Sequence, residues 1–369
     1  MSPARLRIAL DATPLTAPSG GIARYTAELA AALAARFPED EYWLVSDQPW
    51  QGGPAAPNLF RGERPRNWIT QRWWLAGLPL QLRRLDADLF HGTDFAVPYL
   101  NRLPSVLTLH DLSPWKTGEQ RAVAAGRVRR RAPLAIRRAT MILTPSEAIR
   151  REAAERFGLP LSRLAAVPLA PAEQFRPLRE GEIASVLARL KIRCPYLMFV
   201  GTRERRKNLP RLVEAWREAG RIIPELSLVV AGRPGADASE VLNFLPEPGL
   251  HLPGLLADSD LAALLAGAAA FVYPSLYEGF GLPVLEAMRA GAPVVISRDP
   301  ALLEVAAEAA IAVDADSIAD LARAIVELTG NPARRAEYRE RGFRRAAQFS
   351  WGETAVRTRQ VYVEAIRRF

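Results

Sequence analysis

The sequence is poor in the residues that build metal centres and disulfide bonds. Its 369 residues include one cysteine, Cys194, and only three histidines, which lie far apart in the chain. A single cysteine excludes an internal disulfide bond, and such sparse histidines disfavour a zinc site. We therefore expect no metal and no resident cofactor, and a reducing cytoplasm as the natural setting of the chain.

Long apolar segments are missing as well. No run of about 18 or more uninterrupted apolar residues occurs, so we expect no membrane-spanning helix. The first residues pass directly into a strand-like run, "RIALDAT", without the apolar core of a secretory signal peptide. Both observations predict a cytoplasmic protein.

Lysine is scarce too, since the chain has only three, among them Lys207, and draws most of its basic charge from arginine. The net charge is +9, and residues 1–182 carry 25 Lys and Arg against 18 Asp and Glu, whereas the remainder is nearly balanced. Such a surplus suits nucleic acid, an anionic membrane or a phosphorylated ligand, or it simply marks a solvated surface. No helix-turn-helix or RNA-binding signature accompanies it, so we expect no nucleic-acid partner.

Short apolar runs alternate with helical stretches along the chain, and they form two series. The first series begins at residue 7 and the second near residue 190, and the segment 171–183 between them has the composition of an exposed linker. Strands that alternate with helices predict parallel sheets with helices on both faces. We therefore expect an α/β fold with two Rossmann-like, doubly wound domains that face each other across a cleft.

We place these domains at residues 1–180 and 181–350, with a final amphipathic helix at 351–369 joined to the first domain. Ligands of open parallel sheets bind outside the carboxyl ends of the strands. The loops that follow the predicted strands should therefore carry the chemistry.

The segment "YPSLYEGFGLPVLEAMRAGAPVV", residues 273–295, contains the most informative of these loops. Gly279 and Gly281 allow a tight turn after a strand, and Pro283 suits the first turn of the helix that follows. The N-terminus of such a helix binds anions, because its first N–H groups lack partners within the helix and its dipole is positive there. This loop is therefore a candidate phosphate site.

Glu278 and Glu286 flank the same turn. A carboxylate beside an anion site would not bind the phosphate, but it would accept hydrogen bonds from hydroxyls joined to the phosphate, such as a vicinal diol. As isolated residues, Glu278 would cap the helix and Glu286 would lie on the solvated surface. The pair together with the glycines favours a site for a phosphorylated sugar.

The spacing of these glutamates around Gly-Phe-Gly-Leu-Pro resembles the signature of retaining glycosyltransferase family 4, whose members have the two-domain GT-B fold. Segments along nearly the whole chain resemble this family in the same order, among them "GGIARYTAELAAAL", "LTLHDLSP", "LTPSEAIRRE" and "FVGTRERRKNLPRLVEAW". The basic loop, which contains "RKNL", is most similar to that of the bacterial mannosyltransferase-like branch.

The resemblance implies a role for each matching residue. Glu278 would bind hydroxyls of the donor sugar, Glu286 would bind the ribose diol, and Arg206 and Lys207 would meet the diphosphate. His110 would face the donor sugar near the reacting carbon. The backbone would approach the diphosphate or the sugar at six further positions: Gly20, Gly21, Gly279, Phe280, Gly281 and Leu282.

One position departs from the family. Many members have an arginine directly after the glycine that follows the first strand of the second domain, where this chain has Thr202. Arg203 or Arg206 would supply that charge instead, and both stay candidates. Metal-dependent glycosyltransferases hold an ion with an Asp-x-Asp pair, but the pairs at 86–88 and 314–316 lie at a strand start and in a turn. We therefore expect no metal site at either.

The acceptor of the sugar should meet the basic first domain. Tryptophans and arginines cluster there, namely Trp68, Trp73, Trp74, Arg72, Arg83, Arg84, Arg127, Arg129, Arg130, Arg131, Arg137 and Arg138. Basic residues beside large aromatic rings suit an anionic membrane surface or a polyprenyl-linked glycan. A core that contains the tryptophans, with the arginines on a solvated helix face, is the alternative.

We therefore expect a metal-independent, retaining hexosyltransferase that uses a nucleotide sugar, with GDP-mannose as the first choice. Its acceptor would be a glycan or a lipid-linked glycan in cell-surface polysaccharide synthesis, and its place the cytoplasm or the inner face of the membrane. The alternatives are a UDP-sugar-dependent hexosyltransferase of the same family, a nucleotide-sugar epimerase and a non-catalytic nucleotide-sugar-binding protein. A dinucleotide-dependent dehydrogenase fits less well, because "APSGGIARY" lacks the G-x-G-x-x-G spacing.

Overall fold

The computed structural model describes residues 5–17, 20–63, 71–99, 102–120, 126–235 and 247–369. The chain divides into two compact units. The first unit comprises Met1–Leu112, Ala125–Leu169 and Ser350–Phe369, and the second comprises Ser113–Ala124 and Ala170–Phe349. The domain limits at residues 180 and 350 stay predictions beside this division.

A seven-stranded sheet forms the centre of the first unit. Its order is β3-β2-β1-β4-β5-β6-β7, and every neighbouring pair is parallel. The strands are β1 (Arg7–Asp11), β2 (Glu41–Val45), β3 (Leu59–Arg61), β4 (Leu89–Gly92), β5 (Ser105–Thr108), β6 (Met141–Thr144) and β7 (Leu164–Ala166). Every residue of β4, β5 and β6 is buried. Strands covered on both faces read as short continuous apolar runs, which is why the sequence predicts them.

Helices of the first unit begin and end at sequence signals. The α-helices are α1 (Gly21–Arg36), α3 (Leu78–Arg84), α4 (Gly126–Arg138), α5 (Glu147–Phe157) and α14 (Trp351–Arg368). At the start of α5 the side chain of Ser146 accepts a hydrogen bond from the backbone N–H of Ile149, and Gly158 ends the helix in the left-handed conformation. In the described part of the chain, no helix combines the length and the apolar character needed to cross a bilayer.

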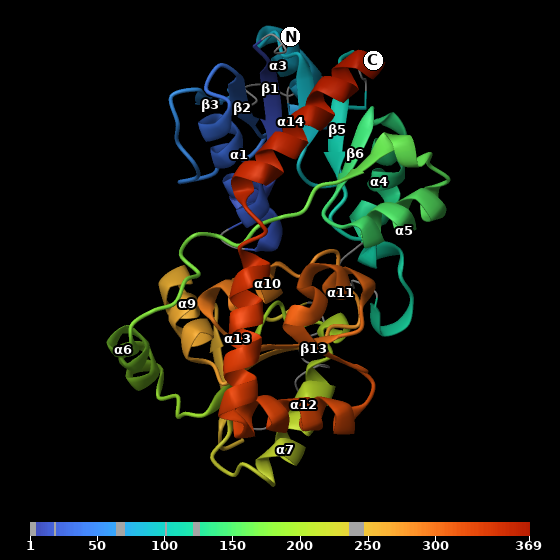
Figure 1. Ribbon diagram of the computed structural model, residues 1–369. Helices are drawn as coiled ribbons and strands as arrows, with labels where there is room; N and C mark the ends of the chain where they lie inside the picture. The colour runs from blue at the N-terminus through green and yellow to red at the C-terminus, as the bar shows by residue number, and fades with distance from the viewer. Residues whose placement is uncertain (1–4, 18–19, 64–70, 100–101, 121–125, 236–246) are drawn as a thin grey trace. The chain divides into compact units, whose positions relative to one another are not determined.

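The last helix, α14, packs beside α1 in the first unit (Figure 1). Arg359 of α14 forms a bidentate ion pair with Asp40, with nitrogen–oxygen distances of 2.6 and 3.0 Å. Both side chains are buried, and Asp40 also accepts hydrogen bonds from the backbone N–H of Leu6 and the hydroxyl of Tyr42. Buried polar contacts, as well as apolar packing, thus attach α14 to this unit.

A six-stranded sheet forms the centre of the second unit. Its order is β10-β9-β8-β11-β12-β13, and every neighbouring pair is again parallel. The strands are β8 (Tyr196–Val200), β9 (Ser227–Ala231), β10 (Leu250–Gly254), β11 (Ala270–Tyr273), β12 (Val294–Ser297) and β13 (Ala310–Val313). The sequence thus correctly predicts parallel sheets in both halves of the chain.

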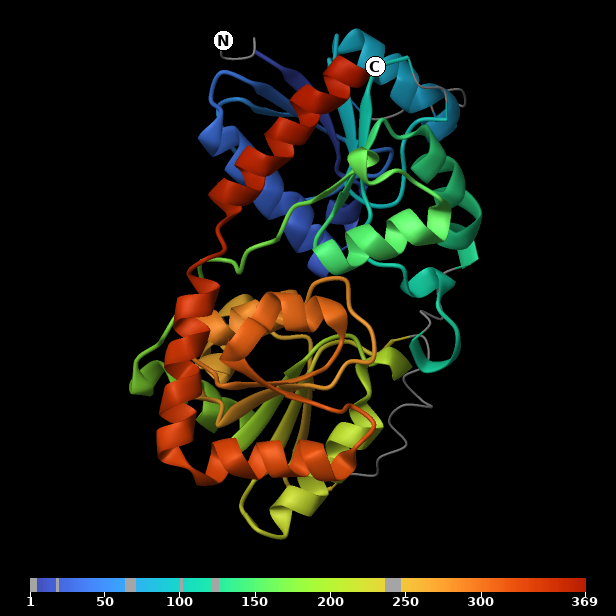
Figure 2. The same ribbon diagram turned by 45° about the vertical axis from the view of Figure 1, so that its right-hand side comes forward.

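The helices of the second unit form two groups. The α-helices of this unit are α6 (Glu180–Leu190), α7 (Leu209–Gly220), α9 (Asp258–Gly267), α10 (Leu282–Ala290), α11 (Pro300–Ala306), α12 (Ile318–Gly330) and α13 (Pro332–Ala346). The helix α7 packs against α12, whereas α9 packs against α6 and α10, and α10 packs against α13. The two groups lie on opposite sides of the strands (Figure 2). The expected doubly wound α/β arrangement is therefore confirmed.

Each sheet has one point at which the order of successive strands reverses. In the first sheet this point lies between β1 and β4, and in the second between β8 and β11. Neighbouring strands there send their following loops in opposite directions, which opens a crevice outside the carboxyl ends of the strands. The loops after these four strands are therefore the places to look for ligand sites.

Candidate active site

The loop after β8 starts with a close backbone approach to the loop after β9. Gly201 and Gly232 have positive φ angles of 158° and 133°, and a Cβ atom on Gly232 would clash with the carbonyl group of Gly201. Beyond this contact, the backbone N–H of Arg203 donates to the carbonyl oxygen of Arg233 at 3.1 Å. The backbone that carries the predicted basic residues is therefore held by its neighbour.

Lys207 ends this loop, and the residue is only 5% exposed. Its ammonium group donates hydrogen bonds to the carboxylate Oε1 of Glu278 and to the hydroxyl of Tyr273, the latter at 2.7 Å. Arg206 also faces Glu278, with Nη1 3.5 Å from Oε2, and its Nε donates to Glu204 at 2.8 Å. The structure thus brings together three of the predicted site residues at the reversal point between β8 and β11.

Charge and burial compete in this cluster. Burial raises the pKa of Glu278, but the charges of Lys207 and Arg206 and the hydrogen bond from Lys207 outweigh it, so the net shift is downward. Burial and the neighbouring Arg206 lower the pKa of Lys207, and Glu278 opposes that change. Each member of the pair therefore supplies the counter-charge that keeps the other ionised away from water.

The turn before α10 requires a glycine at one position. Gly281 is the N-cap of α10 with a φ of 95°, and a Cβ atom there would also clash with the side chain of Leu302. Pro283 follows in the first helical turn. Phe280 is buried and lies edge-to-face with Phe349, at 6.1 Å between ring centroids, and Leu282, two residues further along the chain, is also buried. The N-terminus of α10 therefore lies at Leu282, four residues after Glu278, in the turn for which the sequence predicts an anion site.

The two signature glutamates are both buried, with Glu278 8% and Glu286 4% exposed. Glu286 lies inside α10, so the alternative that it is a solvated surface residue is wrong. The alternative that Glu278 caps the helix is also wrong, because Gly281 occupies the N-cap. Carboxylates are seldom this buried without a functional or structural role, so both glutamates stay candidates for the donor site.

Asp299 is a member of this region that the sequence analysis did not single out. Its Oδ2 accepts a hydrogen bond from the backbone N–H of Glu278 at 3.3 Å, and its Oδ1 caps α11. Burial, together with the charge of Glu278, raises the pKa of Asp299 to about 7. The Asp-Pro pair at the start of a helical run is the signal that would have found it. Asp299 positions the backbone of the loop that carries Glu278.

Arg203 and Arg206 differ in what they contact. The guanidinium of Arg206 faces two glutamates and the carbonyl oxygen of Tyr277, at 3.3 Å. The Nε of Arg203 is buried and has no hydrogen-bond partner among the described residues. Arg203 therefore retains an unused buried donor near the same loop, and both arginines stay candidates for the diphosphate.

The remaining predicted site residues lie in the first unit. Gly20 is the N-cap of α1 with a φ of 137°, whereas a Cβ atom on Gly21 would meet open space. His110 follows β5, and its Nε2 donates to the carbonyl oxygen of Thr93 at 2.8 Å. Its ring lies edge-to-face with that of Tyr25, at 4.8 Å between centroids. A strand-end histidine that bonds only to backbone is a structural alternative to the predicted role of His110, and this bond agrees with it while leaving Nδ1 as the acceptor of the ring.

Burial lowers the pKa of His110, against smaller upward effects of the Thr93 carbonyl and Asp111. The imidazole is therefore neutral near pH 7, as its ordinary pKa of about 6.5 already lies below that value. A neutral ring can face an electron-poor carbon without repelling its positive charge.

The two Asp-x-Asp pairs serve local structure. Asp88 accepts a hydrogen bond from the backbone N–H of Arg7 at 2.7 Å, and Asp314 accepts one from the backbone N–H of Asp316 at 2.9 Å. Asp316 in turn pairs with Arg211 at 3.1 Å. Over the residues that the structure describes, no group of three or more metal-ligating side chains is assembled.

The aromatic and basic cluster of the first unit divides by exposure. Trp73 is buried in the core, as the structural alternative expects, whereas Trp74 is half-buried. Trp68 and the side chains of Arg127 and Arg131 lie outside the described residues. The other arginines of this set are exposed: Arg72, Arg83, Arg84, Arg129, Arg130, Arg137 and Arg138.

Comparison with known proteins relates the chain to transferases of sugars. Residues 190–345 match the family model "Glycosyl transferases group 1", and residues 19–170 match "Glycosyltransferase Family 4". The chain is 32% identical over 294 residues to the O-antigen chain mannosyltransferase B of Escherichia coli, which is 76% of this chain and 75% of that protein. It is 30% identical over 288 residues to the alpha-maltose-1-phosphate synthase of Mycobacterium tuberculosis, covering 70% of this chain and 73% of that one.

A solved structure extends this likeness to the fold. The sucrose-phosphate synthase of Thermosynechococcus elongatus superposes with a TM-score of 0.74 at 22% identity, over 98% of this chain and 99% of that one. The match to a mannosyltransferase over three quarters of its length, with two family models in the expected order, is sufficient to assign the family. The chain is a glycosyltransferase of family 4, in the mannosyltransferase-like branch, with the GT-B fold.

Proposed function

We propose that the chain transfers a mannosyl residue from GDP-mannose to a hydroxyl of a glycan or polyprenyl-linked acceptor. The transfer retains the configuration at the sugar carbon, needs no metal, and serves the synthesis of a cell-surface polysaccharide. The observation that carries this proposal is the buried contact of Lys207 with Glu278, with Arg206 beside it, at the reversal point of the second sheet. Two cations and a helix N-terminus at this place suit a diphosphate.

The bond that breaks joins the sugar carbon to the diphosphate oxygen, and its electron pair leaves with the diphosphate. Lys207, with Arg206 or Arg203, and the first N–H groups of α10 stabilise the negative charge that develops there. Glu278 accepts hydrogen bonds from sugar hydroxyls and Glu286 from the ribose. The acceptor hydroxyl forms the new bond on the face that the diphosphate leaves, and its proton passes to a departing phosphate oxygen.

The four charged side chains of this cluster form two pairs of opposite charge before the donor binds. Arg206 and Lys207 are matched by Glu204 and Glu278. When the sugar hydroxyls bind to Glu278, Lys207 exchanges part of its hydrogen bonding to Glu278 for hydrogen bonding to the diphosphate. Fixed charges of this kind need little rearrangement during the reaction, which is what electrostatic catalysis requires.

The relatives and the resemblance of the basic loop support the choice of sugar and base in this proposal. The O-antigen mannosyltransferase supports mannose. The likeness to an alpha-maltose-1-phosphate synthase, at similar coverage, supports a glucosyl donor as the second candidate.

A donor panel tests the proposal. Purified protein is incubated with GDP-mannose and with UDP-, ADP- and dTDP-sugars, and thermal stabilisation and release of the nucleoside diphosphate are followed. We expect stabilisation and slow release with GDP-mannose, both lost in Glu278→Gln and Lys207→Met and both retained in Glu225→Gln, which changes an exposed residue. Retained activity after chelation of divalent ions is part of the expected result.

Other outcomes overturn parts of the proposal. If only a UDP-sugar stabilises the protein and releases its nucleoside diphosphate, that UDP-sugar replaces GDP-mannose as the donor. Tight binding without release, also in the presence of lipid-linked glycan extracts, favours a binding protein, and conversion of the donor sugar without transfer favours an epimerase. If no donor binds, the proposed donor site is wrong.

A further inference from the structure

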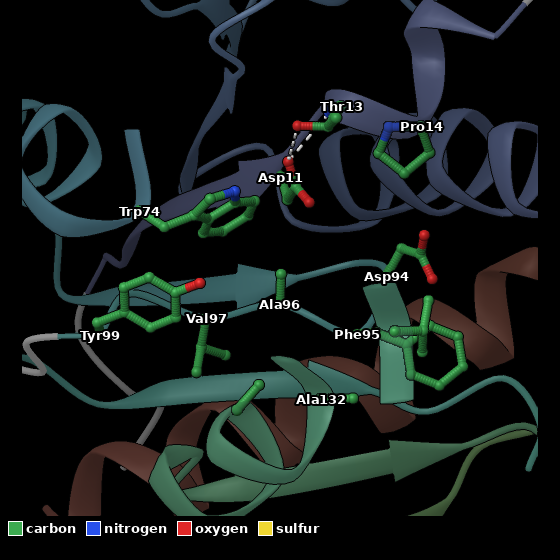
Figure 3. Close-up of a pocket in the computed structure, with 12 residues that line it drawn as sticks. Asp11, Thr13, Pro14, Trp74, Asp94, Phe95, Ala96, Val97, Tyr99 and Ala132 are labelled. Atoms are coloured by element: carbon green, nitrogen blue, oxygen red, sulfur yellow. Dashed lines mark hydrogen bonds between the residues drawn. The ribbon is translucent and has the colours of Figure 1, made fainter. Parts of the chain in front are cut away.

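A pocket lies entirely within the first unit, outside the carboxyl ends of β1 and β4. Its volume is about 290 Å³, near the lower end of the range for small-molecule sites. Its walls come from the end of β1, the π-helical turn Trp73–Gly77, the loop after β4, and α4 (Figure 3). β1 and β4 are the strands between which the first sheet reverses, so this pocket occupies the ligand position of its own sheet. The donor chemistry described above uses none of its residues.

Two aspartates supply the polar part of the pocket. Asp11, the last residue of β1, uses Oδ1 to accept hydrogen bonds from the backbone and the hydroxyl of Thr13, at 3.0 and 2.6 Å. The Oδ1 of Asp94 is buried and has no hydrogen-bond partner among the residues that the structure describes. A buried acceptor without a partner is unfavourable, and such a group in a pocket is explained by a ligand that donates to it.

Aromatic rings supply the apolar part. In Figure 3, Trp74 and Tyr99 lie at one end of the pocket, and Asp94 and Phe95 lie at the other. The backbone N–H of Tyr99 donates to the carbonyl oxygen of Trp74 at 3.1 Å, which holds the two aromatic segments together. Phe95 has a φ of 44°, rare for a residue of its size, and Trp74 lies in a π-helical turn. Both irregularities are typical of functional sites.

We propose that this pocket binds one uncharged sugar ring, the terminal residue of the acceptor glycan. This inference rests on the proposed glycosyl transfer and names the part of the acceptor that the first unit recognises. The apolar face of a sugar ring packs on Trp74 and Tyr99, and its hydroxyls bond to Asp94 and Asp11. A lipid chain would leave Asp94 without a partner, and a phosphate would be repelled by both carboxylates.

The protonation of the two aspartates agrees with a neutral ligand. Burial raises the pKa of Asp11 to about 6, and burial together with the charges of Asp11 and Asp111 raises that of Asp94 to about 7. One or both carboxyls thus change protonation near neutral pH. A hydroxyl serves both forms, because it donates to a carboxylate and accepts from a carboxylic acid.

Binding of simple sugars, measured without any donor, tests this inference. Methyl α-mannoside is titrated at about pH 8 by ligand-observed NMR, and we expect saturable binding with a Kd on the order of millimolar. Asp94→Asn and Trp74→Ala should each weaken it about tenfold or more, because the first replaces a charged acceptor with a neutral amide and the second removes an aromatic face. Asp86→Asn is the matched control, since its side chain is 96% exposed in the same unit, and should change nothing. Mannose 1-phosphate should bind at least about tenfold more weakly, because its charge meets two carboxylates.

Three results would overturn the inference: no saturable binding of the methyl glycoside, equal binding by wild type, Asp94→Asn and Trp74→Ala, or tighter binding of mannose 1-phosphate. The result is separable from the proposed function. If no donor releases nucleoside diphosphate while the sugar still binds and depends on Asp94, the transfer fails and the pocket stands. If a donor is turned over while Asp94→Asn leaves sugar binding unchanged, the pocket assignment fails and the transfer stands.

Discussion

The hydroxyl of Tyr362 lies 2.7 Å from Nδ1 of His91, although 271 positions separate them in the chain. The other ring nitrogen of His91 lies 2.7 Å from the hydroxyl of Thr108, which also bonds to Tyr25 at 2.8 Å. Tyr25 is the ring against which His110 packs. A buried chain of polar groups therefore connects α14 with the surroundings of the predicted catalytic histidine.

Loss of the Arg359–Asp40 pair should destabilise the first unit strongly. Arg359→Ala leaves a fully buried carboxylate without its counter-charge, so we expect a loss of about 3–5 kcal/mol in the free energy of unfolding. Arg357→Ala, two residues away, removes a half-exposed pair with Glu353 and should cost about 0.5 kcal/mol or less. Urea unfolding of both variants measures the difference, and equal effects would contradict the assigned importance of the buried pair.

In a variant that lacks Lys207, a second substitution at Glu278 should restore stability but not activity. Lys207→Met leaves a buried carboxylate beside Arg206 alone, and we expect a loss of about 3 kcal/mol of stability and a fall of about 10²–10³ in kcat. Adding Glu278→Gln should recover most of the stability, because no unpaired charge remains, while activity stays low. A double-mutant cycle of unfolding and turnover measures both, and independent effects on stability would argue against the contact.

Gly281 and Gly21, which stand at the starts of α10 and α1, should respond differently to alanine. At Gly281 a Cβ atom meets Leu302 and the φ is positive, so Gly281→Ala should lower the thermal midpoint and the activity together. At Gly21 the added atom meets open space, and alanine favours a helix over glycine by about 1 kcal/mol. Gly21→Ala should therefore keep or raise the midpoint but lower kcat/KM if the donor lies against this backbone. Unchanged kcat/KM would remove Gly21 from the site.

The stability of the first unit should depend on pH through Asp94. The unfolded chain ionises this residue at about pH 4, whereas the folded chain does so at about 7. The folded state therefore binds more protons between these values, and the contribution of Asp94 is fully present below pH 4 and is lost as the pH rises through 7. Asp94→Asn should be more stable than wild type at about pH 8, with the advantage falling by about 1.4 kcal/mol per pH unit between 7 and 4. Thermal unfolding across this range measures it, and a constant difference would contradict the raised pKa.

Much of the fold was predictable because buried strands have short apolar sequences. The edge strands β3 and β10 were missed, the first because only Leu59–Arg61 pair, and the second because Pro253 interrupts an otherwise weak pattern. The glutamate pair was predictable from its spacing. The contact of Lys207 with Glu278 was not, because it depends on β8 lying beside β11, and local sequence carries no sign of that pairing. Asp94 escaped notice for the same reason, since its importance comes from burial at the reversal of the sheet.

The place of α14 has a consequence for synthesis of the protein. Because Ser350–Phe369 belong to the first unit, a ribosome must complete the whole second unit before the first can close around His91 and Asp40. A nascent chain therefore carries an unfinished N-terminal core until Ser350–Phe369 have been made, and a truncation that removes these residues damages the part of the protein that was made first.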